Sequence, residues 1–298
     1  MIYRTVNLKN EYPMLKKDVK LRCYCPSNFD EFSKNRIRKC VLTIPGGAYC
    51  FVSEREAEPV VLKFLSEDLA CFLLEYNLGP YDYPYPMIEG FAAISYIRKH
   101  KDEFHVDPDH IIVAGFSAGG HFAASLGAFC KKQDYADYLK VKLEDIKVNG
   151  LILSYPVITM YEPTNGSTRD QLLNNRPDLK DYYSIEKQVT PDYPTTFIWT
   201  TDADTCVDSS NSLKLAMALK DNHVKFELHY YPIGEHGASI ANEIVNPKDE
   251  YLANTLSYIA SWIDLAINFI KKIAWGNKNE KNHCQRFNKR RKSQISNW

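Results

Sequence analysis

The chain has 298 residues, 45% of them hydrophobic and 25% charged, and its formal net charge is zero. This composition is that of an ordinary globular protein and excludes a disordered or fibrous chain. A membrane span needs roughly 18 uninterrupted apolar residues, and the longest candidate, residues 258–274, is interrupted by Asp264, Asn268 and two lysines. We therefore expect a globular protein without a membrane span.

The beginning of the chain and its cysteines bear on the cellular compartment. Residues 1–15 are polar and charged and contain no apolar stretch of the kind found in secretory signals. The eight cysteines are scattered and form no Cys-x-x-Cys pair. In a chain without a signal peptide, such thiols are expected to be buried and reduced. The sequence thus predicts a cytoplasmic protein.

Segments with strand and helix patterns alternate along the chain. In chain order, the expected elements are strand 19–24, strand 40–44, helix 56–69, strand 70–76, helix 87–100, strand 111–114, helix 121–130, strand 148–155, strand 195–200, helix 209–220, strand 226–231 and helix 251–273. Strands are predicted from short apolar runs, and helices from apolar residues three and four positions apart. This alternation is typical of an α/β protein with a mostly parallel central sheet and helices on both faces.

Residues 1–273 are expected to form a single domain. Within it, residues 157–193 contain Pro, Asn, Tyr and charge without clear periodicity, and an insertion after a central strand commonly covers an active site as a lid. Residues 274–298 are basic and contain a cluster of Lys and Arg at 289–292. This cluster would suit an arm that binds nucleic acid or an acidic surface. A disordered appendage accounts for it better, so no nucleic-acid partner is expected.

The sharpest motif is Gly115-Phe116-Ser117-Ala118-Gly119, which stands between a predicted strand and a predicted helix. A serine at such a turn is held in a strained backbone conformation, and glycines flank it because side chains there would collide with the neighbouring strand or helix. The turn raises the hydroxyl above the sheet at a helix N-terminus, which favours negative charge. An ordinary glycine-rich turn is the alternative, but both flanking elements that the motif requires are present. Ser117 is the predicted nucleophile.

Attack by a serine on an acyl group also requires hydrogen-bond donors for the oxyanion. These donors are expected in the loop after an upstream strand, where the sequence has Pro45-Gly46-Gly47-Ala48-Tyr49. Glycine allows a ligand to approach the backbone closely. We predict that the backbone N–H groups of Gly47, Ala48 and Ala118 form the oxyanion hole. Taken alone, the loop would be interpreted as a plain β-turn.

The base and the acid are expected after Ser117, in the order Asp then His, on loops that follow later strands. His236 follows the predicted strand 226–231 in a Gly-Glu-His-Gly sequence and is the predicted base. His121 lies close to Ser117 in the sequence but on the following helix, so a supporting or packing role is expected for it.

The sequence offers more than one candidate for the acid of the triad. Asp204 follows the predicted strand 195–200, with Asp202 and Asp208 close by in the sequence TDADTCVD. Spacing alone does not separate Asp202 from Asp204. Whichever aspartate acts would hold the imidazole in the correct tautomer and stabilise its cation.

Several motifs together resemble the bacterial acetyl-esterase and sugar-esterase branch of the α/β-hydrolases, which is related to the hormone-sensitive-lipase-like esterases. They are, in order, PGGAY, YNL, DPDHIIVAGFSAGGH, TPDYPTTFIWTTDADTCVDSSNSL and HYYPIGEHG, and the resemblance covers about residues 18–270. It implies an α/β-hydrolase fold with a small lid, Asp204 as the acid of the triad, and neither a cofactor nor a metal. Many relatives have HGGG in the oxyanion loop, so Ala48 departs from the family pattern.

The expected function is a serine carboxylesterase that hydrolyses short-chain, mainly acetyl, esters through an acyl-enzyme on Ser117. The resemblance implies small-molecule ester substrates, acetylated carbohydrates among them. An arylformamidase, a lipase or a peptidase with the same triad remains an alternative, as does a non-catalytic binding protein on the same fold. The lid and the tyrosine-rich loop 81–85 are expected to line the pocket, for stacking on a sugar or for packing. The sequence leaves open whether the chain forms a homo-oligomer.

Overall fold

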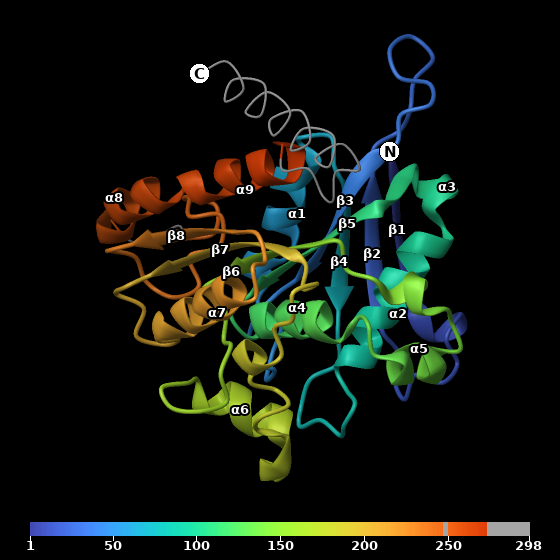
Figure 1. Cartoon of the computed structure of the whole chain (residues 1–298). Coiled ribbons are helices and arrows are strands. Elements are labelled where there is room, and N and C mark those ends of the chain that lie inside the picture. The colour runs from blue at the N-terminus through green and yellow to red at the C-terminus, as the bar shows by residue number, and fades with distance from the viewer. Residues whose placement is uncertain (247–249, 273–298) are drawn as a thin grey trace, which may run out of the picture.

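The computed structural model describes residues 1–246 and 250–272. Within them, eight strands form one sheet in the order β1-β2-β4-β3-β5-β6-β7-β8 (Figure 1). They are β1 (Ile2–Asn7), β2 (Lys20–Cys25), β3 (Arg38–Ile44), β4 (Ala70–Glu75), β5 (Val106–Phe116), β6 (Gly150–Ser154), β7 (Thr195–Thr201) and β8 (Phe226–Tyr231). The pairs β1–β2 and β2–β4 are antiparallel, and the other neighbouring pairs are parallel.

Helices cover both faces of this sheet (Figure 1). Those described are α1 (Glu58–Leu65), α2 (Met87–Lys99), α3 (Lys101–Phe104), α4 (Ala118–Phe129), α5 (Gln133–Leu139), α6 (Gly166–Leu173), α7 (Ser210–Asp221), α8 (Glu250–Ile259) and α9 (Ser261–Lys272). Helices α1, α8 and α9 pack on one face, whereas α2, α4, α5 and α7 pack on the other. No helix in the described ranges is long and apolar enough to cross a bilayer.

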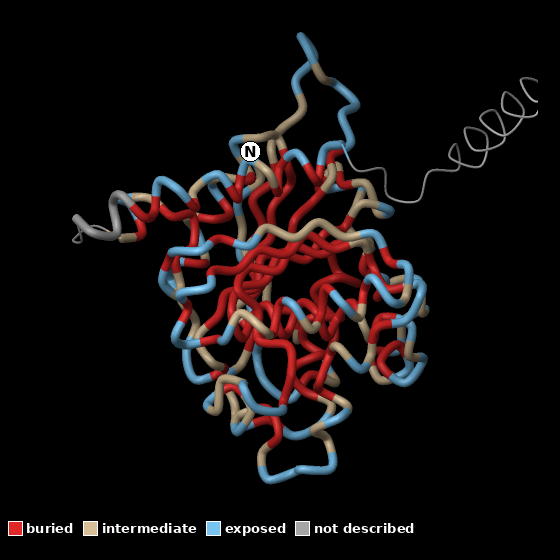
Figure 2. Tube along the Cα trace, turned by 60° about the vertical axis from the view of Figure 1, so that its left-hand side comes forward, coloured by how far each residue is buried: buried red, intermediate tan, exposed pale blue. Residues whose placement is uncertain are grey.

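Successive residues of the central strands belong to two different cores. In β3, Val41 packs into the core on the α1 and α9 side, whereas Leu42 packs into the core on the α2 and α4 side. Ile112 and Val113 of β5 alternate in the same way. Parallel strands covered by helices on both faces are buried on both sides, which explains their continuous apolar sequences. Figure 2 shows these buried strands in the middle of the molecule.

The expected strands and helices are present, with shifted ends. The expected strand 111–114 extends over Val106–Phe116, and the expected helix 251–273 is two helices, α8 and α9. Among the described strands and α-helices, four have no counterpart among the expected ones: β1, α3, α5 and α6. β1 is an edge strand with no fully buried residue, so its sequence lacks the apolar signal of the central strands. α6 is polar and begins where the Asn165 side chain accepts a hydrogen bond from Thr168 N.

The segment 157–193 includes α6 and lies beside the loop that follows β4. The two are joined where Tyr81 N donates a hydrogen bond to Gln171 O at 3.0 Å. The basic tail 274–298 lies outside the described residues, and Cys284 lies within it. The seven described cysteines are free, and five of them are buried: Cys23, Cys25, Cys40, Cys71 and Cys130.

Candidate active site

Ser117 lies at the turn between β5 and α4. Its backbone has φ 52° and ψ −119°, a conformation that side-chain-bearing residues rarely adopt. The turn is tied to the sheet because Ser117 N donates to Ser154 O of β6 at 3.0 Å. A Cβ on Gly115 would lie 2.2 Å from Gly119 O, and a Cβ on Gly119 would lie 2.2 Å from Ile44 O. Close backbone contacts therefore require glycine at both positions.

The structure brings Ser117, His236 and Asp204 into one hydrogen-bonded chain. His236 Nε2 lies 2.8 Å from Ser117 Oγ, and His236 Nδ1 lies 2.7 Å from Asp204 Oδ2. Asp204 follows β7 and His236 follows β8, so the carboxyl ends of neighbouring parallel strands bring them together. The Asp204 side chain is fully buried, whereas the His236 side chain is 19% exposed. When Nδ1–H donates to Asp204, Nε2 can accept the proton of the Ser117 hydroxyl.

The turn after β7 selects one aspartate of the three considered. Asp204 is buried, and its second carboxylate oxygen accepts hydrogen bonds from Cys206 N and Val207 N, both at 2.9 Å. These bonds aim the other oxygen at the imidazole. Asp202 is exposed and accepts a hydrogen bond from a tyrosine of β8, and Asp208 is exposed at the start of α7. Only Asp204 of these three contacts the imidazole.

The loop after β3 lies against Ser117. A Cβ on Gly46 would lie only 2.9 Å from Ser117 Cβ. Gly47 and Ala48 have φ values of 124° and 52°, which turn the chain sharply at this point. The N–H groups of Gly47, Ala48 and Ala118 donate to no acceptor in the described parts of the chain. These three predicted oxyanion donors thus lie on the two segments that adjoin Ser117.

His121 is hydrogen-bonded to a residue of this loop. It is fully buried on α4, where its Nδ1 lies 2.9 Å from Tyr49 Oη and its Nε2 lies 2.8 Å from Tyr183 O. The carbonyl can only accept, so Nε2 carries the proton and Nδ1 accepts from the tyrosine hydroxyl. Burial lowers the pKa of His121 to about 4, so the ring is neutral. One histidine therefore joins the loop after β3 to the segment 157–193.

Glu56 is a buried acid beside the site that the sequence did not single out. It ends the short 3₁₀ turn Glu54–Glu56 before α1 and is only 3% exposed. Burial raises the pKa of its carboxyl group, against hydrogen bonds from Tyr155 and Gly46 that lower it. At the start of a predicted helix, a glutamate is usually a solvated residue, so no local pattern distinguishes this one.

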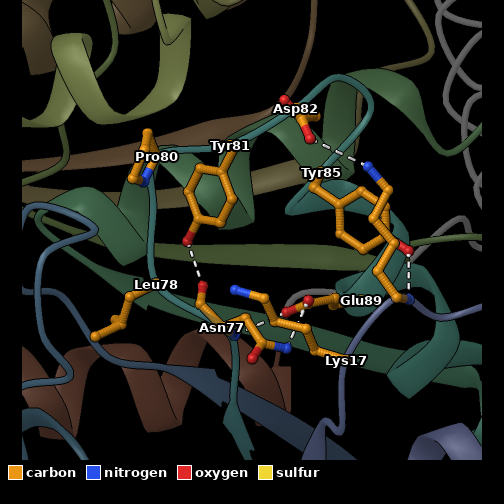
Figure 3. A pocket seen from close by; sticks show the side chains of 9 residues that line it. Lys17, Asn77, Leu78, Pro80, Tyr81, Asp82, Tyr85 and Glu89 are labelled. Carbon is orange, nitrogen blue, oxygen red and sulfur yellow. Dashed lines mark hydrogen bonds and ion pairs between the residues drawn. The ribbon is translucent and has the colours of Figure 1, made fainter.

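The tyrosine-rich loop surrounds a separate, small cavity of about 80 Å³ (Figure 3). Tyr81 and Tyr85 are buried at its wall, where Tyr81 donates to Asn77 O at 2.5 Å and Tyr85 accepts from Lys16 N at 3.0 Å. Tyr83 is exposed and packs instead on a tyrosine of the segment 157–193. Ser117 does not line this cavity. These contacts are those of packing, and a role of the loop in lining the substrate pocket stays a prediction.

Known proteins resemble this chain in sequence and in fold. Residues 24–219 match the family model BD-FAE. The chain belongs to the BD-FAE family. Endo-1,4-beta-xylanase B of Butyrivibrio fibrisolvens is 32% identical over 214 residues, which cover 69% of this chain and 33% of that protein. The chain spans less than half the length of the curated relatives that match it over most of its sequence.

Two solved structures resemble this BD-FAE chain over nearly their full length. The acetyl ester-xyloside bifunctional hydrolase of Caldicellulosiruptor lactoaceticus is 29% identical, with a TM-score of 0.76 and coverage of 92% of this chain and 97% of that one. The carboxylesterase Cest-2923 of Lactobacillus plantarum WCFS1 is 26% identical, with a TM-score of 0.79 and coverage of 93% and 99%. The expected α/β-hydrolase fold is thereby confirmed, as is the resemblance to its esterase branch.

Proposed function

We propose that this chain is a serine carboxylesterase that hydrolyses short-chain acyl esters through an acyl-enzyme on Ser117. The observation that carries the proposal is the hydrogen-bonded chain from Ser117 Oγ through His236 to Asp204, at 2.8 Å and 2.7 Å. A serine at a strained turn, within hydrogen-bond reach of an oriented imidazole, is an activated nucleophile. The esterases and carboxylesterases among the similar structures support the reaction class.

In the proposed first half-reaction, Ser117 Oγ attacks the ester carbonyl while His236 Nε2 takes the hydroxyl proton. The buried Asp204 carboxylate keeps the imidazole in the required tautomer and stabilises the imidazolium that forms. The N–H groups of Gly47, Ala48 and Ala118 bind the oxyanion of the tetrahedral intermediate. His236 then delivers its proton to the leaving alcohol, which departs and leaves the acyl group on Ser117.

The second half-reaction repeats these steps with water. His236 removes a proton from a water molecule, and the resulting nucleophile attacks the acyl-enzyme carbonyl. The same donors stabilise the second oxyanion. Collapse of the intermediate returns the proton to Ser117 Oγ and releases the carboxylic acid.

The proposed substrate class is an acetyl ester, carried by a carbohydrate. The supporting observation is the identity of the relatives, among them a xylanase and an acetyl ester-xyloside hydrolase. A cytoplasmic location stays a prediction of the sequence. Release of acetate from acetylated xylo-oligosaccharides, compared with release from acetylated monosaccharides, measures the carbohydrate preference directly.

The first test is the hydrolysis of p-nitrophenyl acetate, butyrate and octanoate by the wild type and three variants. We expect turnover to be fastest with acetate, and Ser117→Ala to lower kcat by at least about 10⁴-fold. Asp204→Asn is expected to lower kcat by about 10⁴-fold, because the imidazole is no longer held in the tautomer whose Nε2 accepts the Ser117 proton. Asp202→Asn is the matched control, since this exposed aspartate lies two positions away and does not contact His236. Turnover that survives Ser117→Ala would contradict the proposal.

A further inference from the structure

The Glu56 carboxylate is buried, and its two oxygens have separate partners. Oε2 accepts a hydrogen bond from Gly46 N at 2.7 Å, and Oε1 accepts one from Tyr155 Oη at 2.7 Å. No ion pair of Glu56 occurs among the described residues. Burial of a carboxylate costs free energy unless several donors satisfy it. An apolar side chain would fill the same space at a lower cost in free energy. We therefore expect a role of this carboxylate beyond packing.

One side of this carboxylate contacts the loop that carries the predicted oxyanion donors. Gly46 immediately precedes Gly47, whose N–H is one of those donors. A Cβ on Gly46 would lie 2.8 Å from Glu56 Oε2 and 2.9 Å from Ser117 Cβ. Gly46 therefore adjoins both the Glu56 carboxylate and the Ser117 side chain. The carboxylate's hydrogen bond to Gly46 N holds the residue that immediately precedes the predicted oxyanion donors.

The other side connects to the loop that carries the predicted base. Tyr155 follows β6 with φ 37°, and its ring packs edge-on against the His236 ring at 4.9 Å between centroids. Tyr155 Oη, which donates to Glu56, accepts a hydrogen bond from Ser239 N at 3.1 Å. Ser239 stands three residues after His236, and Ser239 O accepts a hydrogen bond from Trp262 Nε1 of α9 at 2.8 Å. The His236 loop is thereby tied to Glu56.

We propose that Glu56 is a positioning residue of the active site, which holds the oxyanion loop and the His236 loop in register through Gly46 and Tyr155. This inference rests on the proposed esterase function. Glu56 bonds Gly46 of the oxyanion loop directly and reaches the His236 loop through the Tyr155 hydroxyl, so one buried carboxylate links the two loops. A displacement of about 1 Å in such a site lowers the rate by as much as 10²-fold, so the carboxylate matters for the rate more than for substrate binding.

The test compares Glu56→Gln and Tyr155→Phe with the wild type. A glutamine can accept one of the two hydrogen bonds but turns its NH₂ group toward the other donor. Tyr155→Phe keeps the bond to Gly46 and removes the link to Ser239. For p-nitrophenyl acetate we expect kcat to fall about 10- to 100-fold in each variant while KM changes by less than about two-fold, because the transition state alone is affected. Melting temperatures are measured in parallel.

Two control variants match these changes away from the site. Glu89 is a second buried glutamate that accepts a backbone hydrogen bond, from Asn77 N at 2.9 Å, at the cavity of Figure 3. Tyr193 is a second buried tyrosine, whose hydroxyl donates to Ala124 O of α4 at 2.8 Å. We expect Glu89→Gln and Tyr193→Phe to keep the wild-type kcat even where they lower the melting temperature. That contrast separates a positioning role from loss of stability.

Each outcome of this experiment either supports or overturns the role proposed for Glu56. If Glu56→Gln hydrolyses the ester with the wild-type kcat, or only its KM changes, the inference is overturned while the proposed function stands. If Glu56→Gln does not fold, Tyr155→Phe decides, and a wild-type kcat in that variant overturns the inference. If the wild type hydrolyses none of the esters, the proposed function fails and the inference with it. A reduced kcat at unchanged KM, with active controls, supports the inference.

Discussion

At the scale of single residues, burial sets the charge of His121. The ring is fully buried between Tyr49 and Tyr183, and burial lowers its pKa from 6.5 to about 4. In the unfolded chain the same imidazole titrates near its ordinary value. Between these two pKa values the unfolded chain binds a proton that the folded chain does not. The free energy of unfolding therefore falls as the pH is lowered through this range.

This linkage predicts a pH-dependent difference between the wild type and His121→Gln. For the wild type, His121 alone is expected to lower the free energy of unfolding by about 2 kcal/mol between pH 8 and pH 5. Glutamine does not titrate, so the variant lacks this loss. Glu89, whose pKa burial raises to about 7, contributes with the opposite sign but is common to both proteins. Urea unfolding at several pH values measures the difference, and a difference that does not change with pH would contradict the prediction.

At the scale of the element, the loop after β3 keeps an unusual backbone. Gly47, Ala48 and Tyr49 have φ values of 124°, 52° and 61° in succession. A left-handed conformation costs roughly 1–2 kcal/mol at each residue with a side chain, so tertiary contacts have to hold it. Tyr49 supplies them: its hydroxyl donates to His121, and its carbonyl accepts from Gly79 N at 2.9 Å. The loop geometry therefore depends on Tyr49 as well as on the hydrogen bond from Gly46 N to Glu56.

Tyr49→Phe is expected to lower kcat for p-nitrophenyl acetate by about 10-fold with little change in KM, because the loop is less well positioned. The lost hydrogen bond is expected to lower the free energy of unfolding by about 1 kcal/mol. Tyr183→Phe is the matched control, since the buried hydroxyl of Tyr183 has no hydrogen-bond partner in the described residues. Equal kcat values in the two variants would show that the Tyr49 hydroxyl does not position the loop. Steady-state kinetics and urea unfolding give the two quantities.

At the scale of the whole molecule, the sheet separates two hydrophobic cores. Ile94 of α2 is buried in one, and Ile263 of α9 is buried in the other. Ile→Val at each position is expected to lower the free energy of unfolding by about 0.5–1.5 kcal/mol. Since the two side chains belong to separate hydrophobic clusters, the double variant should show the sum to within about 0.5 kcal/mol. Urea unfolding of the four proteins tests this, and a larger coupling energy would mean that the sheet transmits packing changes between its faces.

The local units of this protein can be predicted from its amino-acid sequence. The strand–Ser117–helix turn and the buried central strands follow from residues that are neighbours in the chain, because apolar runs and glycine positions encode them directly. Unpredicted elements such as β1 and α6 carry weak apolar patterns, since one lies at the sheet edge and the other is polar. Their structure depends on pairing and capping partners that the local pattern does not reveal.

The contacts that complete the candidate site join residues that are distant in the sequence. Spacing leaves Asp202 and Asp204 equivalent, and the family resemblance implies Asp204. The structure adds the physical reason: the turn that Asp204 closes with Cys206 N and Val207 N brings its carboxylate to His236. Glu56 lies far in sequence from Tyr155, and the two meet because β3 and β6 flank β5 in the sheet. Residue types and their order are properties of the chain, whereas a contact between distant loops is a property of the strand order that places them side by side.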